Sequence, residues 1–166
     1  KQLALNGAVI QMISHGLLTS GMFFLVGMLQ HRTGTRLIDR FSGLGLTTPR
    51  LAILLGLFAF GSLGLPGFSG FVAEFQAIAG VAGVNYWLAV ITAISLVIAT
   101  GLYLWVFAQI VLGQKKENAE VIEDGTRNEL VILISLITLS LLVGLFPQPL
   151  IAVVNQATTL LAAIGG

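Results

Sequence analysis

The sequence predicts an all-α membrane protein with about four transmembrane helices, the second of them broken, plus a short C-terminal interfacial helix. Of the 166 residues, 56% are hydrophobic and 9% are charged, whereas soluble domains carry about 25% charged residues. The mean hydropathy is +0.97, and several apolar stretches can cross a hydrocarbon core of about 30 Å. Because the chain starts at Lys1 without a methionine, we expect residues 1–166 to form a single membrane segment of a longer protein, embedded in the lipid bilayer.

The composition also restricts the chemistry of the chain. Its net charge is +1, so we expect no nucleic-acid partner. It has no cysteine and two histidines. The absence of thiols excludes disulfides, iron–sulfur ligation and thiolate zinc sites, and two histidines are too few for a convincing metal site. The sequence has no nucleophile–base pair or phosphate-binding loop, so we expect no catalytic residue, metal or cofactor in this chain.

The first predicted span covers about residues 3–29, and its polar side chains share one helical face. Gln11, His15 and Thr19 recur every four residues, and Ser14 lies beside them. His15 falls near mid-membrane, where an ionisable residue indicates function by default. We predict that it passes protons along a hydrated face. The alternative is a buried imidazole that hydrogen-bonds a neighbouring hydroxyl and stiffens the bundle.

The second apolar stretch, residues 51–83, is too long for one straight span, because a continuous helix of that length would reach about 50 Å. Leu65-Pro66-Gly67 supplies a break. Pro66 removes a backbone donor and clashes with the preceding turn, and Gly67 permits an irregular backbone. Such a break is tolerated at membrane depth where it is buried in protein or lines a wet cavity. Interrupted helices in transporters often mark the ion site.

Glu74 follows this break by two turns, and no other charged residue lies within 20 positions of it. Gly70 precedes it by one turn, so its face of the helix is small and open to water. A charged carboxylate at mid-membrane costs at least about 3 kcal/mol. We therefore expect Glu74 to stay protonated until a cation approaches and then to release its proton. The alternative is an acid that hydrogen-bonds a carbonyl of the broken helix and transports nothing.

The remaining spans follow from two further apolar runs. A short connection at residues 84–87, with Tyr86 and Trp87 as interfacial anchors, leads to a third span at about 87–112. The fourth span covers about 129–146 and stops at Pro147-Gln148-Pro149. Residues 150–164 are apolar but short, so we expect a helix that lies in the interface or caps the bundle. The hydroxyl groups of the third span are expected to bond to their own helix.

Two polar loops, residues 30–50 and 114–128, carry seven of the eight Lys and Arg residues. Two spans separate the loops, so both lie on one side of the membrane, and the positive-inside rule places them in the cytoplasm. The turn near Tyr86 and both chain ends then lie outside. A short interfacial helix is expected around residues 36–41. The basic residues of the loops are Arg32, Arg36, Arg40, Arg50, Lys115, Lys116 and Arg127.

Several motifs resemble those of the proton-translocating chain M, or mitochondrial chain 4, of NADH–quinone oxidoreductase, the respiratory complex I family. LPGFSGFVAEF at residues 65–75 resembles that family's LPG-x-x-x-F-V-x-E-F signature on a broken helix. The resemblance covers nearly the whole chain, and the motifs occur in the family's order. The others are AVIQMISHGL at 8–17, LVG at 25–27, HRTGTR at 31–36 and FPQP at 146–149.

The resemblance implies the C-terminal part of an antiporter-like subunit, which couples quinone reduction elsewhere in the complex to proton pumping. Glu74 matches the family's terminal proton site in the half-channel to the outside, and His15 matches the histidine of its central hydrophilic axis. The family's glutamate–lysine pair, which would switch Glu74, belongs to helices that precede Lys1. The supporting polar and broken-helix residues are Gln11, Ser14, Thr19, Pro66, Gly67 and Gly70.

The resemblance further implies NADH, flavin, iron–sulfur clusters and quinone in partner subunits, and neighbouring antiporter-like chains as membrane partners. The expected location is the inner (plasma) membrane of a cell, or the thylakoid membrane if the complex takes electrons from NAD(P)H or ferredoxin. Two other functions stay open. One is a D-type subunit of a multisubunit sodium/proton antiporter, which shares the fold and much of the broken-helix motif. The other is a scaffold that transports nothing.

Overall fold

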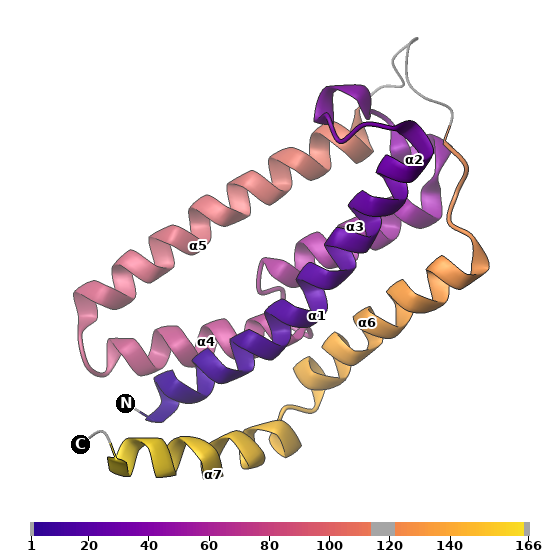
Figure 1. Ribbon diagram of the computed structural model, residues 1–166. Helices are drawn as coiled ribbons and strands as arrows, with labels where there is room; N and C mark the ends of the chain where they lie inside the picture. Colours follow the sequence, from indigo (N-terminus) through magenta and orange to yellow (C-terminus); the bar gives the residue numbers. More distant parts are fainter. Residues whose placement is uncertain (1, 114–121, 165–166) are drawn as a thin grey trace.

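A computed structural model describes residues 2–113 and 122–164, which are almost entirely helical (Figure 1). Three segments are long and apolar enough to cross a membrane: α1, α5 continued through η2, and α6. The elements are α1 (Gln2–Thr33), the 3₁₀ turn η1 (Ile38–Arg40), α2 (Leu44–Thr47), α3 (Pro49–Ser62), α4 (Ser69–Ala82), α5 (Tyr86–Phe107), the π-helical turn η2 (Ala108–Leu112), α6 (Arg127–Leu145) and α7 (Gln148–Ile164).

The second span consists of two short helices, α3 and α4, of 14 residues each. Each is about 21 Å long and alone cannot cross a hydrocarbon core of about 30 Å. Figure 1 shows that α4 continues the course of α3 beyond the break, and that the two together run beside α1. The predicted broken second helix is therefore confirmed, and with it an all-α membrane fold.

The bundle has two distinct ends (Figure 1). Both chain ends and the turn between α4 and α5 lie at one end. The connection from α1 to α3 and the segment that precedes α6 lie at the other end. The two polar loops therefore share one end, as predicted. Much of the loop predicted at 114–128 lies outside the described residues, which resume at Ile122.

The first helix is longer than predicted, so the predicted loop at 30–50 is wrong in its first four residues. α1 continues to Thr33, and polar side chains of its last turn hydrogen-bond to carbonyl groups of the same helix. Thr33 Oγ1 donates to the carbonyl of Leu29 at 2.8 Å, and Arg32 Nη1 donates to that of Met28 at 3.2 Å. Gly34, with φ of +71°, then ends the helix.

Three shorter elements also differ from the prediction. The helix expected around 36–41 is a three-residue 3₁₀ turn, η1, and α2 was not predicted. α7 starts at Gln148 rather than near residue 150. Pro149 is compatible with this start, because a proline in the first helical turn lacks an N–H group that would have no intrahelical partner.

Small residues bring α1 and α4 into close contact. A Cβ atom at Gly7 would lie 2.9 Å from the carbonyl oxygen of Ala73, and one at Gly80 would lie 2.7 Å from Cα of Ala4. Glycine at these positions lets the two backbones approach, as small residues do between membrane helices. This contact holds α4, and with it Glu74, against the polar face of α1.

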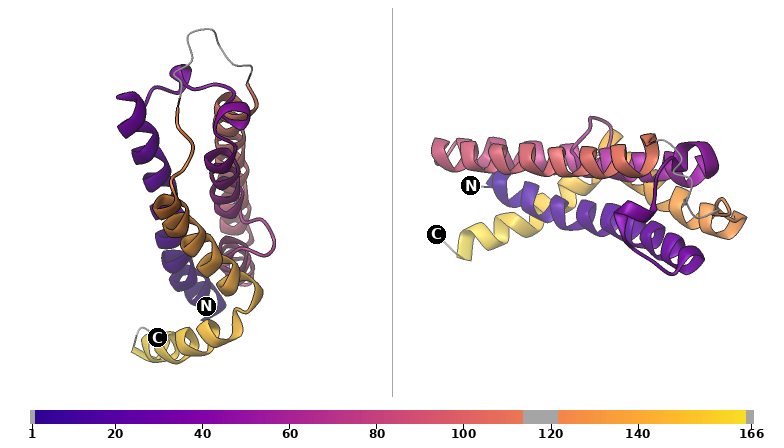
Figure 2. Two further views of the ribbon diagram at one scale, coloured as in Figure 1. Left: turned by 90° about the vertical axis from the view of Figure 1, so that its right-hand side faces the viewer. Right: turned by 90° about the horizontal axis from the view of Figure 1, so that it is seen from above.

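The apolar core lies between α1, α3 and α6. Phe58 is fully buried there, and its ring packs over Gly21, with Leu25 and Leu133 nearby in the same cluster. α5, by contrast, contacts α3 and α4 at the edge of the bundle (Figure 2). Large apolar side chains along α5, such as Trp87 at 73% exposure, face outward. Such a face suits contact with lipid or with another membrane chain.

The C-terminal helix docks on the beginning of α1 through polar side chains. Thr158 Oγ1 donates to Asn6 Oδ1 at 2.6 Å, and Asn6 Nδ2 donates to Asn155 Oδ1. Gln2 Nε2 donates to Thr159 Oγ1 at 2.6 Å. α7 therefore lies across one end of the bundle, beside the N-terminus of α1, as Figures 1 and 2 show.

Candidate functional site

The break between α3 and α4 is built by two glycines that flank a proline. Gly64 and Gly67 have φ of +66° and +103°, a region that glycine adopts without steric cost. Pro66 lies between them and has no N–H group to leave unpaired. The backbone N–H of Leu65 still donates to the carbonyl of Phe60 at 3.3 Å. The break is therefore a defined turn, and the predicted roles of Pro66 and Gly67 in breaking the helix agree with it.

The carboxyl group of Glu74 reaches back from α4 into this break. A Cβ atom at Gly64 would overlap Oε2 of Glu74 and would lie 3.1 Å from its Cδ. Glu74 itself is partly buried. The space beside the irregular backbone is thus occupied by the acid that the sequence singles out.

A cavity of about 60 Å³ joins Glu74 to the polar face of α1. Its volume corresponds to about two water molecules. It brings together six of the predicted residues, whereas Pro66 and Gly67 do not line it. The lining residues are Gln11, Ser14, His15, Leu18, Thr19, Ser62, Gly70, Glu74 and Tyr103.

His15 reaches this cavity from an exposed position on α1. Thr19 Oγ1 lies 3.0 Å from Nδ1 of His15, and the hydrogen bond stays within one helix. The imidazole is therefore neither buried nor bonded to a second helix through this contact. Thr19 Oγ1 also lies 3.4 Å from Nε2 of His15, so both ring nitrogens are within hydrogen-bond distance of the same hydroxyl group. The relay role of His15 and the structural alternative both stay predictions.

Gln11 connects the small cavity to a larger one of about 300 Å³ on the α5 side. Glu74 also lines both cavities, and Thr92 and Ser95 supply hydroxyl groups to the larger one. The side-chain oxygen Oε1 of Gln11 is buried and has no hydrogen-bond partner among the described residues. An unpaired buried acceptor is unusual, and this one belongs to a residue that lines both cavities together with Glu74.

The hydroxyl groups of α5 bond to their own helix, as predicted. Thr92 donates to the carbonyl of Leu88 at 2.8 Å, and Ser95 donates to that of Thr92 at 2.7 Å. Tyr103, another polar residue of α5, also lines the small cavity. Sequence reasoning gave it no role, because no local pattern shows which face of α5 meets α3 and α4.

Three serines from three helices meet beside this site, and we call Ser14, Ser69 and Ser140 the serine chain. Ser69 Oγ lies 2.8 Å from Ser14 Oγ of α1 and 2.8 Å from Ser140 Oγ of α6. The backbone N–H of Ser69 also donates to Ser140 Oγ at 3.4 Å. Each of the three residues is at most 1% exposed. Ser14 was predicted as a supporting residue, but the contribution of α6 was not.

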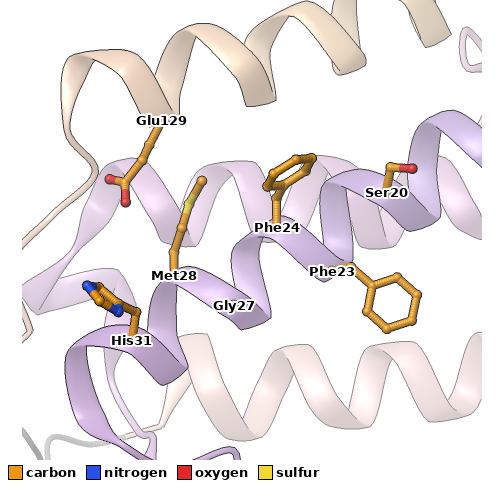
Figure 3. A pocket seen from close by; sticks show the side chains of 7 residues that line it. All are labelled: Ser20, Phe23, Phe24, Gly27, Met28, His31 and Glu129. Carbon is orange, nitrogen blue, oxygen red and sulfur yellow. The ribbon is translucent and has the colours of Figure 1, made fainter.

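A larger groove of about 550 Å³ lies between α1 and α6, away from Glu74 (Figure 3). It is mostly apolar, with Phe23, Phe24 and Met28 along α1, and Glu129 faces it from α6. The charge of Glu129 is already paired, because its Oε2 accepts from Arg32 Nη2 at 2.6 Å. Among the described residues, no three His, Asp or Glu side chains are grouped closely enough to hold a metal ion.

Comparisons with known proteins connect this geometry to a family. Residues 1–100 match the family described as NADH:quinone oxidoreductase/Mrp antiporter, TM. The chain is 35% identical over 148 residues to NADH-quinone oxidoreductase subunit M of Rhodobacter capsulatus, covering 89% of the chain and 29% of the relative. It is 32% identical over 163 residues to NAD(P)H-quinone oxidoreductase chain 4, chloroplastic, of Physcomitrium patens. This match covers 92% of the chain and 32% of the relative.

Solved structures show the same fold. A chain of respiratory complex I from Thermus thermophilus with bound NADH matches with a TM-score of 0.83 and 28% identity, over 95% of this chain and 34% of that one. A chain of the Mrp complex from Dietzia sp. DQ12-45-1b matches with a TM-score of 0.79 and 22% identity, over 95% of this chain and 38% of that one. The chain thus spans about a third of the length of these relatives.

Proposed function

Because this chain belongs to the NADH:quinone oxidoreductase/Mrp antiporter transmembrane family, we propose that it is the C-terminal part of a proton-translocating subunit, of the M or chain 4 kind. In this proposal the subunit belongs to an NADH–quinone or NAD(P)H–quinone oxidoreductase, as the names of its relatives suggest. NADH, flavin, iron–sulfur clusters and quinone belong to other subunits. This chain contributes proton movement to the translocase and no redox chemistry.

One observation carries the proposal: Glu74 and His15 line the same small polar cavity at the helix break. A carboxylic acid in a low-dielectric site stays neutral until a positive charge stabilises its anion. The imidazole of His15 offers ring nitrogens for hydrogen bonding, and the cavity, of about 60 Å³, has room for about two water molecules. In this proposal a proton passes between Glu74 and His15 through this cavity.

The position of Glu74 gives the path a direction. α4 runs from the break to the end of the bundle that holds the α4–α5 turn (Figure 1). The basic loops lie at the opposite end and are cytoplasmic by the positive-inside rule. In this proposal Glu74 receives a proton from the middle of the membrane and releases it towards the outside, past Gln11 and the larger cavity. The membrane is the plasma membrane of a bacterium or the thylakoid membrane.

A subunit of a multisubunit sodium/proton antiporter is the second candidate, because the family description names the Mrp antiporter, and a chain of the Mrp complex also matches. That match, at 22% identity, carries the fold alone. The relatives named subunit M or chain 4 reach 35% and 32% identity over most of this chain. The oxidoreductase is therefore the better supported proposal. Purification separates the two, because flavin and iron–sulfur proteins accompany this chain in the first case and are absent in the second.

The substitution Glu74→Gln tests the carrier role. It keeps the size and hydrogen-bonding capacity of the side chain but removes its titratable proton. We expect quinone-dependent proton uptake by vesicles that hold the intact complex to fall at least about tenfold, a modest value for loss of a proton-transfer group. Glu123→Gln, the same change at an exposed residue of the loop before α6, is the control and should leave uptake unchanged. Normal uptake in Glu74→Gln would refute the carrier role and leave the scaffold alternative.

A further inference from the structure

The serine chain joins the first residue of α4 to the two helices that flank the break. Each serine hydroxyl has one proton to donate and two lone pairs that accept, so Ser69 Oγ either donates to one neighbour and accepts from the other, or accepts from both. In every arrangement Ser69 Oγ takes part in both bonds. All three hydroxyl groups are buried, and a buried network whose polar groups bond to one another favours a single packing arrangement.

The backbone around Ser69 is enclosed from two sides. A Cβ atom at Gly70 would lie 2.5 Å from the carbonyl oxygen of Gly61, at the end of α3. A Cβ atom at Gly144 of α6 would overlap the backbone of Gly67 and Phe68. Ser140 and Gly144 are one turn apart on α6, so the same face of that helix supplies both the hydroxyl group and the close contact.

This arrangement controls where Glu74 points. Glu74 follows Ser69 by five residues on one helix, which places it about 140° around the helix axis from Ser69. Ser69 therefore faces α1 and α6, while Glu74 faces Gly64 and the small cavity. Ser69 and Glu74 belong to one continuous helix, so a rotation of α4 at Ser69 would displace the carboxyl group of Glu74 from that cavity.

The serine chain is not suited to carry protons onward. On α6, Leu136 lies one turn before Ser140 and Gly144 lies one turn after it. Ile137 precedes Ser140 by three residues. None of these side chains can accept a proton from Ser140. The hydroxyl groups therefore lead from the cavity, which Ser14 lines, into apolar core.

We propose that Ser14, Ser69 and Ser140 are positioning residues that hold the broken helix closed around Glu74 and keep its carboxyl group in the small cavity. The proposal rests on the proposed function, in which Glu74 carries protons. It adds that α6, which carries none of the predicted proton-transfer residues, determines the geometry of the acid.

Carbodiimide labelling of Glu74 in the assembled complex tests this proposal. Dicyclohexylcarbodiimide adds the O–H of a protonated carboxylic acid across one of its C=N bonds, with no leaving group, and the adduct is quantified by mass spectrometry. The reagent is far larger than the small cavity of about 60 Å³, but it can approach Glu74 through the larger cavity of about 300 Å³, which Glu74 also lines. A carboxyl group held in the small cavity should therefore react slowly, and one displaced towards the larger cavity should react faster. We expect about fivefold faster labelling in Ser69→Ala and Ser140→Ala, the factor that corresponds to loss of one ordinary hydrogen bond.

Ser135→Ala is the matched control. Ser135 lies on α6 like Ser140, but it is exposed and donates to the carbonyl of Val131 at 2.7 Å, so its loss should not change the labelling rate. A wild-type rate in Ser140→Ala would overturn the proposal, even with a lower melting temperature, because it would show a purely structural role. An equal increase in Ser135→Ala would also overturn it.

The carrier role of Glu74 and the positioning role of the serine chain can be refuted independently of each other. If Ser69→Ala does not assemble, Ser140→Ala removes one end of the serine chain and carries the same expectation. Glu74→Gln supplies the background level of labelling. Normal proton uptake in Glu74→Gln refutes the carrier role whatever the labelling rates are, whereas lost uptake in Glu74→Gln with unchanged labelling in the serine variants refutes only the positioning role.

Discussion

The site of Glu74 is shaped by glycines as much as by polar groups. Its Oε2 lies directly against Gly64, where the left-handed backbone, with φ of +66°, leaves no room for a side chain. Gly70, one turn before Glu74, lines the same cavity and lets the start of α4 approach Gly61. Gly64 therefore meets two requirements at once: the turn needs its backbone conformation, and the acid needs the space.

Gly64→Ala is expected to lower both the melting temperature of the complex and its proton uptake. Alanine in the left-handed region costs about 1–2 kcal/mol, and its methyl group would displace the carboxyl of Glu74. Gly34→Ala is the matched control, because Gly34 has a similar φ of +71° but open space, with no contact within 4 Å, where the methyl group would lie. It should lower stability and leave uptake intact. Equal uptake in Gly64→Ala and the wild type would contradict the expected displacement.

The residues of the small cavity could be predicted where one helix supplies them. Gln11, His15 and Thr19 share a face because they are four residues apart, and the structure places them together. Tyr103 of the cavity and Ser140 of the neighbouring serine chain could not be predicted, since each comes from another helix. Their direction depends on how that helix is rotated against its neighbours, and in a uniformly apolar helix the sequence period does not encode this rotation. The proton-transfer roles themselves stay predictions.

At the scale of elements, α3 has no side-chain cap of its own. Its N-cap residue, Thr48, makes no capping hydrogen bond. Instead, the carboxylate of Asp124, from the segment before α6, accepts from the backbone N–H of Arg50 at 3.1 Å and of Leu51 at 3.2 Å. A negative charge there also complements the positive end of the helix dipole. The first half of the broken helix is thus fixed by a residue 74 positions away in the sequence.

Asp124→Ala should loosen the start of α3. Loss of a capping side chain costs about 1 kcal/mol, so amide hydrogen exchange in peptides that cover residues 49–55 should become about fivefold faster. Glu123→Ala, at the exposed neighbouring residue, should leave this exchange unchanged. If both variants exchange at the wild-type rate, the tertiary cap contributes nothing to the stability of α3.

The order and type of the helices could be predicted, because apolar runs and a Leu-Pro-Gly break are local signals. Helix ends were predicted less well. α1 continues to Thr33 through bonds from Arg32 and Thr33 to its own carbonyl groups, although the sequence turns polar at Gln30. The cap on α3 joins segments that are distant in sequence, so no local pattern reveals it. Such long-range contacts decide where an element begins, whereas hydropathy decides only that it exists.

At the scale of the whole molecule, polar contacts tie together the two ends of the bundle. Arg32 of α1 pairs with Glu129 of α6 beside the long connections. At the opposite end, Asn6 of α1 bonds to Asn155 and Thr158 of α7. α1 is therefore fastened at both ends and contacts α3, α4, α6 and α7. It forms the central helix against which the broken helix is held, while α5 presents its apolar face to the surroundings.

The two ends of this bundle should lie on opposite sides of the membrane, with the long connections in the cytoplasm. Residues 1–166 contain no cysteine, so labelling of a cysteine introduced there, measured above that of the unsubstituted subunit, reports this orientation. Val84 is 62% exposed in the α4–α5 turn, and Glu123 is exposed at the other end. In intact cells a membrane-impermeant maleimide should label this subunit in Val84→Cys and not in Glu123→Cys, and inverted vesicles should give the opposite result. The reverse pattern would place the basic loops outside, and Glu74 would then release its proton to the cytoplasm.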